Sequence, residues 1–262
     1  MDHHTLGQVR FVETLAMDAW PAAEVTLLDG WRLRFSQGVT RRANSVWPNQ
    51  ADGELALDDK LATVERFYAG HGLPARYQIC PAQQPTDLDA ILAGRGYRAD
   101  ASTQVQLASV DGVLAKADRR TPPPGWTLTV GERFDADWFA TYREAEGFDD
   151  HAAAMRQAII QRIAAPAGFA LLHVDGAPVA LGLGVLEAGH LGVFSMATRP
   201  DFRRQGAATF VLAGLAHWAQ VRGAEQIYLQ VMDHNTGARA LYAGLGFQTL
   251  YGYHYREHVV TR

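Results

Sequence analysis

The spacing of hydrophobic residues predicts alternating helices and strands in the first part of the chain. Apolar residues that recur every three or four positions predict helices at 5–20, 58–69 and 87–93. Segments with a two-residue period predict strands at 24–35, 41–47, 77–80 and 97–108, the first of them a hairpin. This order of elements indicates a domain in which helices cover a sheet.

The same patterns continue through the second part of the chain. Strands are expected at 126–130, 169–174, 178–186, 191–198 and 227–232. Helices are expected at 136–146, 152–164 and 207–221, followed by a short one that starts near Gly237. This part is therefore also expected to be α/β.

The segment between these two parts has no apolar period. Residues 109–125 end in Thr-Pro-Pro-Pro-Gly, and consecutive prolines favour an extended spacer. We therefore predict a first domain over 1–110, a Pro-rich linker over 111–125 and a second domain over 126–262.

The two predicted domains share their turn residues in the same order. Four pairs of residues lie roughly 150 positions apart. The pairs are Pro48 and Pro200, Gly72 and Gly223, Tyr77 and Tyr228, and Gly96 and Gly246. A constant offset across four pairs indicates a tandem repeat.

Composition excludes several classes of protein. The 262 residues are 48% hydrophobic and 20% charged, and the net charge of −4 gives no general attraction to nucleic acid or to an anionic membrane. Cys80 is the only cysteine, so an intrachain disulfide is excluded, and no His/Asp/Glu set has the spacing of metal ligands. With no signal-like N-terminus and no long apolar stretch, the protein is expected to be cytoplasmic.

One stretch has the pattern of a phosphate-binding turn. The apolar segment 191–198 is followed by Pro200, by the basic turn Arg203–Ala208 and by the helix expected at 207–221. Small residues in such a turn let the backbone approach an anion, and the N–H groups and dipole of the helix attract it. We therefore expect a phosphate group to bind here.

The sequence of this turn resembles that of a known family. Arg203-x-x-Gly206-x-Ala208 is similar to the Q/R-x-x-G-x-G/A pyrophosphate loop of the GNAT superfamily of acyl-CoA-dependent N-acetyltransferases. Asn235 and the segment Ala238–Phe247 resemble the "N…A…LY…GF" ending of that family, so the resemblance covers about 126–262. It implies a tandem GNAT fold of the α/β (α+β) class, with two mixed, mostly antiparallel sheets flanked by helices, and acetyl-CoA as the cofactor.

The resemblance also implies the residues that bind the cofactor. They come from the end of one strand, the loop after it and the last helix: Met196, Ala197, Thr198, Arg203, Arg204, Gln205, Gly206, Ala207, Ala208, Thr209, Asn235, Arg239 and Tyr242. In the family, a main-chain N–H group of that strand polarises the thioester carbonyl, which places it near Met196–Thr198. Asn235 is expected either to bind the pantetheine arm or to cap the last helix.

Tyr242 occupies the position of the tyrosine that protonates the leaving thiolate in the family. The alternative is that it packs in the core. The general base stays open, because 190–198 contains no carboxylate. Glu146 and His234 are the candidates carried forward, beside Glu144, Asp149, Asp150, His151, Glu187 and His254.

The first copy lacks the basic loop. At the corresponding position it has the acidic segment 51–56, in which Asp52 and Glu54 would repel a pyrophosphate. We therefore interpret the first copy as degenerate. Its expected role is to form one wall of the acceptor pocket or a pseudo-dimer interface.

The resemblance implies an acetyl-CoA-dependent N-acetyltransferase that acts on a primary amine of a small molecule, of amino-acid or amino-sugar type, as a monomer or homodimer. Other amine acceptors are the thiol-sugar amine of the mycothiol synthase type and a protein or peptide amine. The intact basic loop and the acidic pI argue against a Fem-type transferase that uses aminoacyl-tRNA. A non-catalytic acyl-CoA sensor or interaction module is the alternative from another class.

Overall fold

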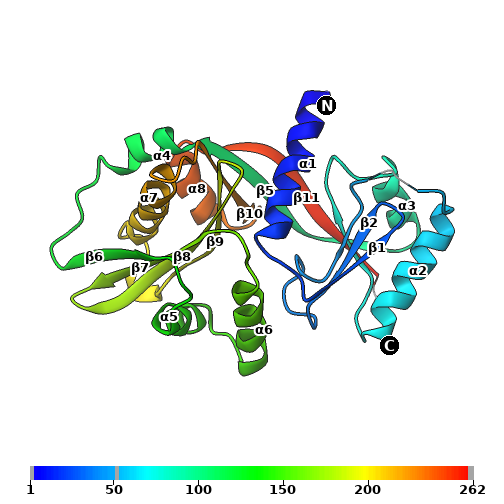
Figure 1. Ribbon diagram of the computed structural model, residues 1–262, viewed down its shortest axis with the longest axis horizontal. Helices are drawn as coiled ribbons and strands as arrows, with labels where there is room; N and C mark the ends of the chain where they lie inside the picture. Colours follow the sequence, from blue (N-terminus) through cyan, green and yellow to red (C-terminus); the bar gives the residue numbers. More distant parts are fainter. Residues whose placement is uncertain (1–2, 51–52, 259–262) are drawn as a thin grey trace. The chain divides into compact units, whose positions relative to one another are not determined.

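The computed structural model describes residues 3–50 and 53–258 (Figure 1). Ala51 and Asp52, which belong to the acidic segment of the first copy, lie outside the described residues. The chain forms two compact units, one of residues 1–104 with 251–262 and one of residues 105–250. The first unit thus includes residues 251–258, which the predicted division at 110 and 126 did not anticipate.

The N-terminal unit is a mixed sheet with three helices. The helices are α1 (His3–Asp18), α2 (Leu57–Gly70) and α3 (Leu88–Gly94). The strands are β1 (Glu24–Leu28), β2 (Trp31–Phe35), β3 (Val46–Trp47), β4 (Arg76–Ile79) and the end of β11 (Gln248–Glu257), in the order β1-β2-β3-β4-β11. The β3–β4 pair is parallel and the other three pairs are antiparallel. Trp31, Leu61 and Tyr77 lie in its core.

The strand predicted over 41–47 is wrong in length, since only Val46 and Trp47 are extended in the sheet. Asn44 explains the difference. Its side-chain oxygen accepts hydrogen bonds from the N–H groups of Ser36 and Gly38, and its amide donates to the carbonyls of Val39 and Thr40. These bonds fold the preceding segment into a loop that a continuous strand could not form.

The second unit is built around a sheet with the strand order β5-β10-β9-β8-β7-β6. The strands are β5 (Arg98–Ser109), β6 (Trp126–Gly131), β7 (Ala167–Val174), β8 (Ala177–Glu187), β9 (His190–Thr198) and β10 (Gln226–Met232). β6 to β9 pair antiparallel, and β9 pairs parallel with β10. Within both units, antiparallel pairs outnumber parallel ones, as expected.

Helices cover both faces of this second sheet. They are α4 (Val110–Ala117), α5 (Ala136–Glu146), α6 (Asp150–Gln161), α7 (Ala207–Gln220) and α8 (Thr236–Gly244). Figure 1 shows α4, α7 and α8 on one face, with α5 and α6 on the other. The expectation of a spacer over 111–125 is wrong for its first half, because Val110, Val113 and Leu114 are buried against the core as part of α4.

Small residues let α7 lie close to the sheet. A Cβ atom at Gly182 would lie 2.8 Å from Val211 Cγ1, and one at Gly214 would lie 2.3 Å from Leu128 Cδ2. Both distances are shorter than Cβ atoms show in real structures, so a larger residue at either position would require the neighbouring side chain to move. Helix α7 thus packs closely on β6 and β8.

The predicted tandem repeat is present in the order of elements. The segment β3-α2-β4-α3-β5 of the first copy corresponds to β9-α7-β10-α8-β11 of the second. Strand β3 pairs parallel with β4 in the first copy, and β9 pairs parallel with β10 in the second. Helices α2 and α7 are each 14 residues long. Gly72 and Gly223 end these helices with φ of +70° and +81°.

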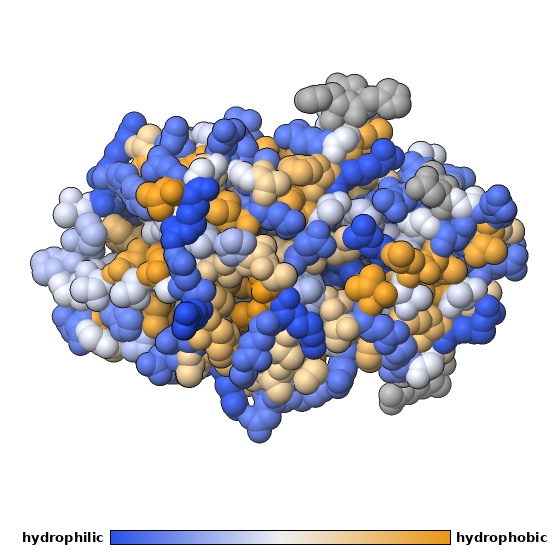
Figure 2. Space-filling model, in the orientation of Figure 1, coloured by the Kyte–Doolittle hydropathy of each residue, from blue (hydrophilic) through white to orange (hydrophobic). Residues whose placement is uncertain are grey.

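The surface is mixed in polarity. On the face drawn in Figure 2, hydrophilic residues are distributed between smaller groups of hydrophobic ones. Among residues 3–50 and 53–258, no helix has the length and apolar character needed to span a bilayer.

Candidate active site

A bulge interrupts strand β9 where it faces α7. Leu181 of β8 pairs with Ala197, but Leu183 pairs with Phe194, so two residues of β9 stand opposite Gly182. The first of the two, Ser195, has a φ of +49°. The Trp138 indole N–H of α5 donates to the carbonyls of Ala170 at 3.0 Å and Gly182 at 3.2 Å, opposite the bulge.

Strands β9 and β10 separate at this bulge. Their parallel pairing ends at Val193 and Leu229, although β9 continues to Thr198 and β10 to Met232. Within the described residues, positions 195–198 of β9 therefore have no ladder partner in β10. Their main chain is available to a ligand that lies between the two strands.

The basic loop forms a left-handed turn before α7. Arg204 has a φ of +62° and Gly206, the residue that precedes α7, a φ of +96°. Within the described part of the chain, the N–H groups of Gly206, Ala207 and Ala208 have no hydrogen-bond acceptor. No acidic residue stands in the first turn of α7. Free amides at a helix N-terminus fit the pyrophosphate of an acyl-CoA.

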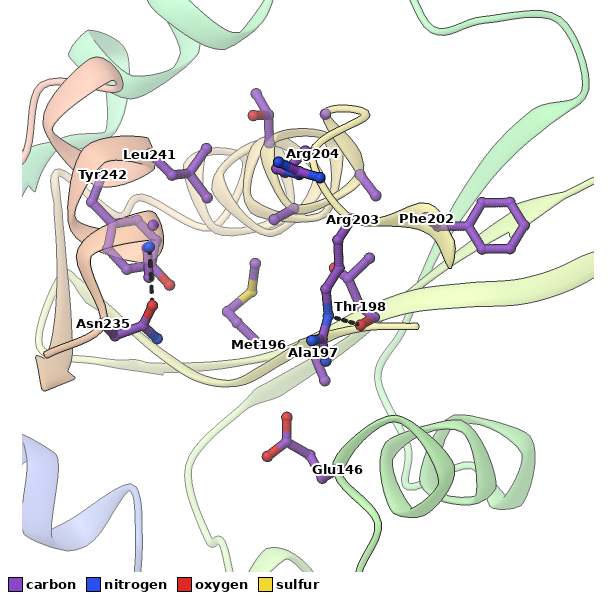
Figure 3. Close-up of a pocket in the computed structure, with 16 residues that line it drawn as sticks. Glu146, Met196, Ala197, Thr198, Phe202, Arg203, Arg204, Asn235, Leu241 and Tyr242 are labelled. Carbon is purple, nitrogen blue, oxygen red and sulfur yellow. Dashed lines mark hydrogen bonds between the residues drawn. The ribbon is translucent and has the colours of Figure 1, made fainter. Parts of the chain in front are cut away.

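A cavity of about 480 Å³ joins this loop to β9 and α8. Eleven of its lining residues belong to the predicted cofactor-binding set: Met196, Ala197, Thr198, Arg203, Arg204, Gly206, Ala207, Ala208, Thr209, Asn235 and Tyr242. Glu146, a candidate general base, also lines it. Figure 3 shows Tyr242 and Asn235 at the α8 end of the cavity and Arg203 at the other end.

The Arg203 side chain is held in place by a hydrogen bond from its Nε to the Thr198 carbonyl, at 3.0 Å. Its two terminal nitrogens make no further hydrogen bond within the described residues. Arg204 is exposed at the start of α7 (Figure 3). Both guanidinium groups can therefore reach an anion at the loop.

Tyr242 is buried in the wall of the cavity, with 7% of its surface exposed. Burial raises the pKa of its hydroxyl to about 12, so the group is neutral and protonated throughout the physiological range. The ring packs against Phe247 at 5.7 Å between centroids, and the hydroxyl makes no hydrogen bond with the described residues. The residue is thus both a packing residue and a free hydrogen-bond donor beside the cavity.

Asn235 caps α8, which was one of its two expected roles. Its side-chain oxygen accepts a hydrogen bond from the Ala238 N–H group at 3.1 Å. The side chain also lines the cavity, which leaves its amide group available to a ligand.

Glu146 differs from the other acidic residues around it. Glu144 pairs with Arg199, Asp150 pairs with Arg143, and Asp149 caps α6. Within the described residues, Glu146 makes no ion pair or hydrogen bond and lies at the cavity. Figure 3 shows its carboxylate directed toward the end of β9 from α5, while Tyr242 approaches from α8.

Three of the predicted site residues do not line this cavity. The Gln205 amide donates to the Asp201 carbonyl at 2.7 Å and so braces the loop. The Arg239 guanidinium donates to the Asp233 carbonyl at 3.1 Å. His234 is exposed in the turn before α8, and His254 pairs with Asp89 in the N-terminal unit.

Four lining residues were not among the predicted ones: Phe202, Gly237, Ala238 and Leu241. Of these, Ala238 could have been found from its spacing to Tyr242, because residues four positions apart share one face of a helix. No local pattern pointed to Phe202. Among residues 3–50 and 53–258, no group of three or more metal-ligand side chains occurs.

In the first copy, a side chain occupies the position of the anion. The Asp29 carboxylate accepts hydrogen bonds from the N–H groups of Glu54 at 2.8 Å and Leu55 at 3.1 Å, and it lies 3.1 Å from Lys60 Nζ. Burial opposes its ionisation, but the hydrogen bonds from Lys60, Leu55 and Glu54 outweigh burial and lower its pKa. The segment that corresponds to the pyrophosphate loop is therefore already bound to a carboxylate.

This arrangement predicts one coenzyme A site per chain. The loop at Arg203–Ala208 has free amides, whereas the corresponding segment before α2 is filled by Asp29. Calorimetric titration with acetyl-CoA should therefore give a stoichiometry of one. A stoichiometry of two would contradict the interpretation of the first copy as degenerate.

Comparison with known proteins identifies the family of this chain. The family model described as "Probable histone acetyltransferase Rv0428c C-terminal" matches residues 6–256. An uncharacterized N-acetyltransferase of Bacillus subtilis, YobR, is 29% identical over 96% of this chain and 99% of its own. The probable histone acetyltransferase Rv0428c of Mycobacterium tuberculosis is 27% identical over 92% of this chain and 70% of its own.

Solved structures share the fold. A GCN5-related N-acetyltransferase from Kribbella flavida superposes with a TM-score of 0.69 at 16% identity, over 94% of each chain. A tandem GNAT protein from the clavulanic acid biosynthesis pathway superposes with a TM-score of 0.62 at 13% identity, over 83% of this chain and 76% of that one. The chain therefore belongs to the Rv0428c C-terminal acetyltransferase family and is an acetyl-CoA-dependent N-acetyltransferase of the GNAT superfamily.

Proposed function

We propose that this enzyme transfers the acetyl group of acetyl-CoA directly to the primary amine of a small molecule. The observation that carries the proposal is the single cavity in which the free amides at Gly206–Ala208, the neutral hydroxyl of Tyr242 and the unpaired carboxylate of Glu146 meet. A sensor that only bound acyl-CoA would need the first of these and neither of the others.

Each group has a distinct task in the reaction. Bound acetyl-CoA supplies an activated acyl group whose carbon–sulfur bond breaks as the carbon–nitrogen bond forms. The main chain at the end of β9 donates a hydrogen bond to the carbonyl oxygen as negative charge develops there. Glu146 accepts, through a water molecule, the proton that the attacking amine loses. Tyr242 transfers its hydroxyl proton to the departing sulfur, so coenzyme A leaves as the thiol, and the proton held by Glu146 returns to Tyr242 through solvent.

Charges beside Glu146 support an acceptor that carries a carboxylate near its amine. The Arg156 guanidinium lies 4.0 Å over the Phe148 ring, which packs 5.0 Å from Tyr142. Burial raises the pKa of the Tyr142 hydroxyl, and the charge of Glu146 raises it further. Ser195 and Arg156 lower it, so all three side chains lie near Tyr142. Arg156 has no carboxylate partner among the described residues. A free amino acid could use both charges, its amine at Glu146 and its carboxylate at Arg156.

A protein amine is the second candidate acceptor. It is supported by the names of relatives, which include a probable histone acetyltransferase and a ribosomal protein bS18-alanine N-acetyltransferase of Haemophilus ducreyi that aligns with 58 residues of this chain. A lysine side chain or the N-terminus of a peptide offers Glu146 an amine but brings no carboxylate to Arg156.

A panel of amines separates these possibilities. Free amino acids, their carboxamides, amino sugars, and peptides with a free N-terminus or an internal lysine are compared by the rate of thiol release from acetyl-CoA. We expect free amino acids to be better acceptors than their carboxamides. Faster turnover of peptides than of every small amine would overturn the small-molecule assignment.

Glu146→Gln tests the role of the carboxylate. With the best acceptor, kcat should fall by roughly 100-fold below neutral pH, and part of the rate should return as pH rises and more of the amine is already neutral. Asp137→Asn, which removes an exposed carboxylate from the same helix, is the matched control and should leave kcat unchanged. An equal loss of rate at every pH would argue against proton transfer to Glu146.

A further inference from the structure

Arg120 lies beside the pyrophosphate loop although it belongs to the segment between α4 and β6. A Cβ atom at Gly206 would lie 3.5 Å from Arg120 Nη1, so the guanidinium stands against the loop. Asp118, the nearest acidic residue along the chain, pairs with His217 at 3.2 Å. Arg120 therefore has no carboxylate partner within the described residues, and its side chain is a free cation next to an anion site.

A second cavity, of about 400 Å³, begins at the same place. It lies between the segment that contains Arg120, strand β6 and helix α7. Its walls are mainly apolar, and Trp126 and Phe210 lie in it with their rings edge to face at 5.4 Å. Phe210 is also 3.7 Å from the position of a Cβ atom at Gly206, so this groove is continuous with the pyrophosphate loop.

Coenzyme A has the chemistry that fits this continuity. Beyond its pyrophosphate the molecule carries a ribose with a 3′-phosphate and a flat adenine ring. A phosphate needs a cation such as Arg120, and an adenine ring stacks well in an apolar groove lined by aromatic side chains. The groove is also within the usual size of small-ligand pockets, about 300–1,000 Å³. A purely apolar ligand in the groove would make no ionic interaction with the Arg120 guanidinium.

We propose that the segment before β6 completes the coenzyme A site: Arg120 binds a phosphate of the 3′-phosphoadenosine end, and the groove at Trp126 and Phe210 holds the adenine. The predicted linker is thus part of the cofactor site. This inference rests on the acyl-CoA site at Gly206, so the test first measures whether the wild-type protein binds coenzyme A.

The measurement is calorimetric affinity for three ligands: coenzyme A, dephospho-coenzyme A and 4′-phosphopantetheine. Arg120→Gln should weaken coenzyme A binding roughly 10-fold or more, while the neighbouring Arg119→Gln should change it less than about twofold. Thr121→Trp, which fills the groove, should weaken coenzyme A but not 4′-phosphopantetheine, and Thr121→Ser should have no effect. Unchanged thermal midpoints exclude misfolding.

Dephospho-coenzyme A lacks the 3′-phosphate and so shows which phosphate Arg120 contacts. If Arg120→Gln and the wild type bind dephospho-coenzyme A equally well, Arg120 contacts the 3′-phosphate. If Arg120→Gln loses affinity for coenzyme A and dephospho-coenzyme A equally, Arg120 contacts the pyrophosphate. Wild-type affinity of Arg120→Gln for coenzyme A, or an equal loss in Arg119→Gln, overturns the role of Arg120. Undiminished affinity in Thr121→Trp overturns the groove. If the wild type itself does not bind coenzyme A, it is the proposed function that fails.

Discussion

Gly206→Glu should weaken coenzyme A binding by at least about 100-fold, the largest effect expected of any single substitution in this protein. Two causes act together. Gly206 has a φ of +96°, which costs a non-glycine residue of the order of 1–2 kcal/mol. The new carboxylate would also stand beside free amides that are needed by the pyrophosphate, and it would repel that group.

The first copy shows what such a substitution would create. There, the Asp29 carboxylate already accepts hydrogen bonds from two N–H groups and pairs with Lys60. A glutamate at position 206 would have Arg120 as the corresponding cation, because that guanidinium lies beside it. The glutamate side chain introduced by Gly206→Glu is therefore expected to occupy the anion site at the N-terminus of α7 without unfolding that helix.

Two controls separate charge from backbone strain. Gly223→Glu introduces the same side chain at a residue with a φ of +81°, at the other end of α7, where no atom would contact the new Cβ. It should lower stability by a similar amount and leave coenzyme A affinity unchanged. Gly206→Ala adds strain without charge and should lose less affinity than Gly206→Glu. Equal affinities of Gly206→Glu and wild type for coenzyme A would remove the loop assignment.

Tyr242→Phe should lower kcat by about 100-fold and leave the Kd for acetyl-CoA within about twofold of wild type. The substitution keeps the packing against Phe247 and removes only the hydroxyl, which makes no hydrogen bond within the described residues. That hydroxyl matters once negative charge develops on the sulfur. Its loss is therefore expected to affect the transition state more than the bound ground state.

The leaving group provides the decisive measurement. A donor thioester whose thiol has a lower pKa needs less stabilisation of the leaving sulfur. The ratio of kcat between wild type and Tyr242→Phe should therefore be smaller with such a donor. A packing role alone would reduce the rate equally with both donors. Because the pKa of Tyr242 is raised to about 12, its deprotonation should not shape the wild-type pH–rate profile between about pH 6 and 9.

Short-range patterns predicted the elements that carry the site. The helix expected at 207–221 is observed at Ala207–Gln220, and the strand expected at 191–198 is observed at His190–Thr198. These predictions succeeded because helix and strand periodicity, proline and glycine act over a few residues. The tandem repeat was visible for the same reason, since its glycines stand at helix ends in both copies.

Predictions failed where a side-chain hydrogen bond or burial in the core, rather than the hydrophobic period, decides the conformation. The segment 41–47 reads as a strand, yet the Asn44 side chain binds the backbone of the loop before it. Residues 109–125 read as a spacer, yet α4 forms because Val113 and Leu114 reach the core of the second unit. Burial can stabilise a helix of eight residues that would be marginal alone.

The sequence by itself determined the family, the fold class and the loop at Arg203–Ala208, because a phosphate-binding turn is a local motif whose residues are contiguous. Only the tertiary structure decided which acidic residue stays unpaired at the cavity, which carboxylate fills the first copy, and which cation stands beside Gly206. Asp29 and Arg120 owe these roles to residues far away in the chain, and Glu146 owes its role to having no such partner within the described residues. Such pairings depend on how the units fold, and no local pattern encodes them.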